Sequence, residues 1–76
     1  MDYQNYISPQ TRKAILEQEI ALWKNTRYQW EVRHRVLTRI GASKDELSEV
    51  MSQLERCEKA LDLLNEELTG IDSLEY

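Results

Sequence analysis

Residues 47–68 read LSEVMSQLERCEKALDLLNEEL, and this stretch decides the fold. Its apolar residues recur at alternating spacings of three and four positions. That spacing is the a and d pattern of an α-helix that pairs with another helix along one seam. The stretch therefore predicts a long helix with a narrow apolar stripe, made of Leu47, Val50, Leu54, Cys57, Leu61, Leu64 and Leu68.

An earlier segment carries a matching stripe, which consists of Leu16, Ile20, Trp23, Arg27, Trp30, His34 and Leu37. If the chain folds back near Gly41, Leu37 lies beside Leu47 and Leu16 lies beside Leu68. A single alignment of the two segments then places every residue of both stripes between the two helices. The sequence therefore predicts an all-α fold, an antiparallel two-helix hairpin packed like a coiled coil.

Local signals place the helix ends. Ser8 followed by Pro9 is typical of a helix start, because the serine can accept from free amides and proline tolerates the first helical position. Gly41 can adopt the left-handed backbone of a C-terminal cap. Ser43 and Glu46 have the spacing of a capping box, which opens a second helix directly after a short turn.

These signals predict a hairpin over residues 9–70, with a helix over 9–40, a turn over 41–43 and a helix over 44–69. Gly70 is expected to be left-handed and to end the second helix, with Ile71 folded back onto its last turn. Residues 1–8 are expected to form a flexible N-terminal arm, and residues 71–76 a C-terminal tail.

A hairpin of 76 residues has little core. Chains below about 80 residues rarely bury enough apolar area to be stable without further support. Apolar residues outside the seam, mostly in the first helix, widen its stripe toward that of a helix inside a bundle. We therefore expect a homodimer that forms a four-helix bundle, or a protein partner, to cover a candidate face of Ile15, Leu22, Val36, Ile40, Met51 and Leu63.

The two predicted helices carry opposite charge, although the net charge of the chain is only −4. Residues 9–40 contain seven basic and three acidic side chains, and residues 43–69 contain three basic and eight acidic ones. This asymmetry favours pairing of the helices within the hairpin. The alternative is a basic face that contacts nucleic acid or an acidic protein, with Tyr28, Arg33, Arg35, Arg39 and Lys44 as its candidates.

The seam of the first helix alternates large aromatics with groups that can carry charge, in Trp23, Arg27, Trp30 and His34. The structural interpretation is that the tryptophans fill space between the helices while Arg27 and His34 set register or oligomeric state. The functional alternative is a partly open groove that holds an anionic group or a side chain of a partner.

Residue types that support catalysis or metal binding are scarce. The chain has one histidine and one cysteine, so no zinc site of four such ligands can form within it. Cys57 is expected to act as a small core residue. We see no nucleophile–base pair and no glycine-rich phosphate loop, and we expect no catalytic or metal-binding residue, no cofactor and no small-molecule substrate.

No apolar run approaches the roughly 18 residues of a membrane span, and the N-terminus lacks the pattern of a signal peptide. With a single cysteine, no internal disulfide is expected. We therefore expect a cytoplasmic protein with no membrane contact. The sequence favours a non-enzymatic interaction or regulatory module, with a nucleic-acid-binding regulator and a subunit of a larger assembly as the alternatives.

Overall fold

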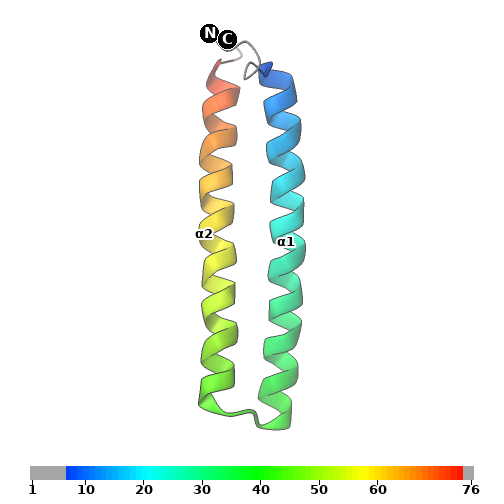
Figure 1. The fold of residues 1–76 in the computed structure, drawn as a ribbon, viewed down its shortest axis with the longest axis vertical. Coiled ribbons are helices and arrows are strands. Elements are labelled where there is room, and N and C mark those ends of the chain that lie inside the picture. The colour runs from blue at the N-terminus through cyan, green and yellow to red at the C-terminus, as the bar shows by residue number, and fades with distance from the viewer. Residues whose placement is uncertain (1–6, 75–76) are drawn as a thin grey trace.

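The computed structural model describes residues 7–74, which form two long helices and no strand (Figure 1). Helix α1 spans Pro9–Ile40 and helix α2 spans Lys44–Leu74. The helices lie side by side and run antiparallel, so the first turn of α1 is beside the last turn of α2. The predicted two-helix hairpin is therefore confirmed.

The start of α1 follows its local sequence. Ser8 is the N-cap, with extended backbone angles, and its Oγ accepts a hydrogen bond from the amide of Thr11 at 3.2 Å. Pro9 occupies the first helical position, where a missing amide hydrogen costs nothing. These contacts explain why the helix begins where the sequence predicted.

The turn between the helices is held at both ends. Gly41 is left-handed, with φ 76° and ψ 40°, and its amide donates to the carbonyl of Thr38 while that of Ala42 donates to Leu37. This pair of bonds is a Schellman motif. At the start of α2 the Glu46 amide donates to Oγ of Ser43, and the Ser43 amide donates to Glu46 Oε1, both at 3.2 Å.

The end of α2 differs from the sequence prediction. The helix passes through Gly70, whose φ is not positive, and continues to Leu74, so the predicted end at Thr69 is wrong. The reason is Ile71, which occupies the next seam position and is only 8% exposed. Burying an isoleucine stabilises by about 1.5–3 kcal/mol, which exceeds the roughly 1 kcal/mol that glycine costs inside a helix.

Residues 1–6 of the predicted N-terminal arm, and residues 75–76 of the predicted tail, lie outside the described residues. Residues 71–74 of that tail belong to α2 instead.

The core is a single line of side chains between the two helices. All fourteen predicted seam residues are buried or half-buried. The molecule measures 55 × 24 × 14 Å, so it is one helix deep and both broad sides of the hairpin are open. Among the described residues the buried hydrophobic side chains are Leu16, Ile20, Val50, Cys57, Leu61 and Ile71.

The left-handed backbone of Gly41 gives a prediction about stability. Gly41→Ala should lower the free energy of unfolding by about 1–2 kcal/mol, because a Cβ disfavours this conformation, although the Cβ would meet no other atom within 4 Å. Gly41→Asn should cost less, since asparagine tolerates left-handed angles. Urea unfolding followed by circular dichroism, at one protein concentration, measures both. Equal stability of the alanine variant and the natural chain would contradict this account.

Candidate interaction surface

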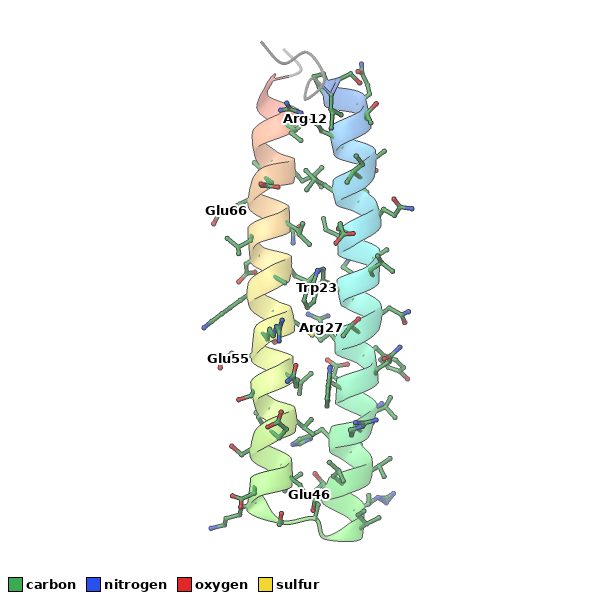
Figure 2. The ribbon with its side chains drawn as sticks, viewed as in Figure 1. Arg12, Trp23, Arg27, Glu46, Glu55 and Glu66 are labelled. Atoms are coloured by element: carbon green, nitrogen blue, oxygen red, sulfur yellow. The ribbon has the colours of Figure 1, made fainter. Side chains whose placement is uncertain are left out.

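The polar members of the seam lie between the helices and are partly exposed. Figure 2 shows Trp23 and Arg27 projecting from α1 toward α2, whereas Glu55 and Glu66 point outward from α2. Arg27 forms an ion pair with Glu31 on its own helix, with Nε 3.8 Å from Oε2, and its side chain is 37% exposed. This exposure means that the pair contributes little to stability.

One of the seam tryptophans forms a cation–π contact within α1. The guanidinium of Arg33 lies over the ring of Trp30, 5.1 Å from its centroid. His34 is half-buried, and its backbone carbonyl accepts a hydrogen bond from the Thr38 hydroxyl at 2.8 Å. Trp30 therefore keeps one side toward the surface, covered by an arginine rather than by α2.

The groups suited to metal or thiol chemistry are dispersed. Cys57 is free and 1% exposed, so its thiol is enclosed by the seam. Within residues 7–74 no three side chains of the histidine, cysteine, aspartate and glutamate types gather closely enough to hold a metal ion.

A broad groove opens between the helices near the turn, with a volume of about 800 Å³. Its apolar lining comes from both helices and includes Trp30, Val36 and Val50. Arg33 lines it from α1, and three acidic residues line it from α2. We call this hollow the turn groove; its acidic residues are Asp45, Glu46 and Glu49.

A second hollow of about 550 Å³ lies at the opposite end of the hairpin, and we call it the open-end groove. Apolar side chains again dominate its lining, with one charged side chain from each helix, Arg12 and Glu67. Gly70 also lines it, and a Cβ at this position would meet no atom within 4 Å. Its apolar lining is Ile7, Ile15, Leu16 and Ile71.

Both grooves open on the same side of the hairpin. Ile15 lines the open-end groove, and Gln29 and Val36 line the turn groove. The positions of these three residues differ by multiples of seven. Seven residues make two helical turns, so all three lie on the same side of α1. Leu22 lies between them in the same series and is 56% exposed. Ile40 lies seven residues after Arg33, and Leu63 lies seven before Gly70, so both lie on this side too. We call this side the apolar face; its exposed apolar residues are Ile15, Leu22, Val36 and Ile40 from α1 and Leu63 from α2.

Met51 lies apart from the other five candidates for the partner face. It lines a hollow of about 470 Å³ together with Glu31 and Glu58, and its seam-flanking position is on the other side of α2 from Leu63. A neighbouring hollow of about 330 Å³ includes Lys24, Arg27 and Glu58. The side opposite the apolar face is therefore polar, and Met51 does not extend the apolar face.

The candidate basic residues divide between two surfaces. The guanidinium of Arg35 lies over the exposed ring of Tyr28, 5.9 Å from its centroid, on the outer side of α1. Arg33 belongs to the turn groove instead. Arg39 and Lys44 are exposed near the turn. The structure brings together Tyr28 and Arg35 but not all five candidates.

Sequence reasoning missed the open-end groove because it ended α2 at Thr69, before Gly70 and Ile71, which line this groove. A signal was present in Ile71, which follows Leu68 at the three-residue spacing of the heptad stripe and is buried in the structure. Arg12 and Glu67 were not among the candidate site residues, and both line this apolar hollow.

Neither described helix contains a segment long and apolar enough to cross a membrane.

The burial of Cys57 gives a second prediction. A thiol-specific disulfide reagent should react with the folded chain only through transient opening of the seam. The rate should fall about tenfold, relative to the unfolded chain, for each 1.4 kcal/mol of opening free energy. Rapid mixing with the reagent over a urea series measures this dependence. Reaction at the unfolded rate in the absence of urea would contradict the buried position.

Comparison with known proteins adds no relative to this description. No protein-family model, curated protein or solved structure matches the chain. The surfaces of the hairpin are therefore the basis for its proposed function.

Proposed function

We propose that this chain is a non-enzymatic protein-interaction module that self-associates through the apolar face to form a four-helix bundle. The observation that carries the proposal is the concentration of exposed apolar side chains and two apolar hollows on one broad side. Ile40 is 70% exposed, Leu63 64% and Leu22 56%. Exposed apolar side chains that gather on one side of a small protein commonly mark a binding site.

The energies involved are of the right size for association. A dimer would cover five half-exposed apolar side chains on each copy. If each contributes roughly half of what full burial of such a side chain contributes, the assembly is stabilised by about 10 kcal/mol. Association itself costs about 4–15 kcal/mol in lost freedom of motion. Apolar burial therefore offsets this cost only approximately, and the affinity depends on how well the two surfaces fit.

A catalytic role is not part of this proposal. The thiol of Cys57 is 1% exposed and so cannot reach a substrate in the folded chain. In the seam register His34 lies opposite Val50, two helical turns from Cys57, so the two side chains are not a nucleophile–base pair. We propose a cytoplasmic location, which suits a free thiol.

The apolar face should be sensitive to a single charge. Leu22→Asp should weaken self-association at least about tenfold, because the carboxylate would have to leave water at the interface. Asn25→Asp adds the same charge on the exposed outer side of α1 and should leave association unchanged. Light scattering after size-exclusion chromatography, over a series of protein concentrations, measures the mass of each variant.

A mass above the monomer for the natural chain and Asn25→Asp, with a lower mass for Leu22→Asp, is the expected result. A folded natural chain that is monomeric at every concentration would contradict self-association. The apolar face would then have to be covered by another protein, as in a subunit of a larger assembly.

Nucleic-acid binding is the second candidate, and the contact between Arg35 and Tyr28 is the observation that favours it. A basic group beside an exposed aromatic ring can contact a phosphate and stack a base. The acidic residues Asp45, Glu46 and Glu49 lie near the same end of the hairpin and oppose a polyanion. We therefore rank this function below self-association.

The second candidate makes a distinct prediction. Binding to a mixed pool of short RNAs or DNAs should weaken steeply with salt and fall several-fold in Arg35→Ala. Glu55→Ala, on the outer side of α2, is a control for nonspecific charge effects. Fluorescence anisotropy at low salt is the measurement, and absence of binding there would eliminate this candidate.

A further inference from the structure

We infer that the second copy packs its α1 antiparallel against α1 of the first, around a twofold axis that passes beside Thr26. This inference rests on the proposed self-association and adds which residues of the two copies meet. Four of the five exposed residues of the apolar face belong to α1. A contact that covers them is therefore made mainly by α1, and the arrangement that sets apolar residues against apolar residues pairs α1 with itself.

The charges of α1 are complementary to those of a second α1 that runs antiparallel to it and is centred at Thr26. Glu19 lies seven residues before Thr26 and Arg33 lies seven residues after it. Seven residues make two helical turns, so all three residues lie on one side of α1. A second α1 that runs antiparallel and is centred at Thr26 therefore places each Glu19 opposite Arg33 of the other copy.

The side chains of this register are available for such a contact. Glu19 and Arg33 are exposed, and neither forms an ion pair within residues 7–74. The guanidinium of Arg33 lies over Trp30, 5.1 Å from the ring centroid, which holds the charge at the rim of the turn groove. Thr26 is small and half-buried, so it lets the two copies of α1 approach closely at the axis.

The same register matches the apolar residues at the two ends of α1. Ile15 lies eleven residues before Thr26 and Val36 lies ten after it, so each faces the other across the interface. Ile40, which is 70% exposed, reaches the open-end groove of the second copy, opposite Arg12. Side chains from the turn end of one copy thus cover the hollow at the open end of the other.

The competing arrangement sets α1 of one copy against α2 of the other. It would pair Leu22 with Leu63 and bring helices of opposite net charge together. It would also set Val36 and Ile40 against Glu49 and Glu46, which line the turn groove. Exposed charge pairs are screened by salt and contribute less than the burial of apolar side chains, so the pairing of α1 with itself is favoured.

Disulfide cross-linking tests this arrangement directly. T26C should form a covalent dimer with itself under mild oxidation, because the two sulfurs meet at the axis. N25C, at nearly the same level but on the outer side of α1, is the matched control and should not cross-link. The natural chain is a second control, since its one thiol, on Cys57, is buried.

Exchange of charges supplies a test that does not depend on cysteine geometry. E19R should weaken the dimer about tenfold, because each of the two attractive pairs of Glu19 with Arg33 becomes a repulsive pair of arginines. The double variant E19R/R33E exchanges the charges and should restore the dimer. Glu17→Arg, on the opposite side of the seam, is the control and should have a smaller effect. Sedimentation over a series of protein concentrations measures each dissociation constant.

The outcomes separate this inference from the proposal on which it rests. A natural chain that is monomeric by light scattering contradicts self-association itself. A dimer in which a mixture of L22C and L63C cross-links while T26C does not overturns the pairing of α1 with α1. A dimer that E19R weakens but E19R/R33E does not restore also overturns it, whereas self-association would stand in both cases.

Discussion

A helix in water can hide only the stripe of side chains that faces another helix, and within residues 7–74 α1 and α2 pack against each other alone. The buried core of this molecule depends on that one contact. It runs along the whole hairpin and encloses a single line of side chains, of which Cys57 is the most deeply buried at 1% exposure. Because the molecule is 14 Å deep, there is no second layer to cover the residues beside that line.

The seam residues are buried to different degrees along its length, and hollows lie beside the seam at both ends. Near the open end, Leu16, Ile20 and Ile71 pack well and are buried. Toward the turn, α1 contributes Trp30 and Leu37, which are only half-buried by a single opposing helix. A seam that is covered by a single helix leaves hollows at its flanks, even beside the buried Leu16 and Ile71, and a further helical layer can fill them. The incomplete core and the candidate interaction surface therefore have one physical cause.

Features that depend on a few neighbouring residues were predictable. The cap at Ser8, the left-handed Gly41 and the reciprocal bonds of Ser43 and Glu46 all lie where the sequence placed them. Gly70 was not predictable by the same rule, although it resembles Gly41 in following a long heptad stripe. Its helical backbone depends on the burial of Ile71 against α1, which is a tertiary contact.

The sequence by itself determined the antiparallel hairpin and which residues are buried or half-buried along it, because the heptad pattern gives each segment one apolar stripe and a short turn brings the two stripes together. Only the tertiary structure decided which exposed residues share a surface. It placed Leu63, seven residues before Gly70, on the side where the grooves open and Met51 on the polar side, and it separated Arg33 from Arg35. The physical reason is that a heptad pattern specifies which side of a helix is covered. The surroundings of each side chain outside that covered side depend on how close the other helix lies and on which of its residues stand beside that side chain.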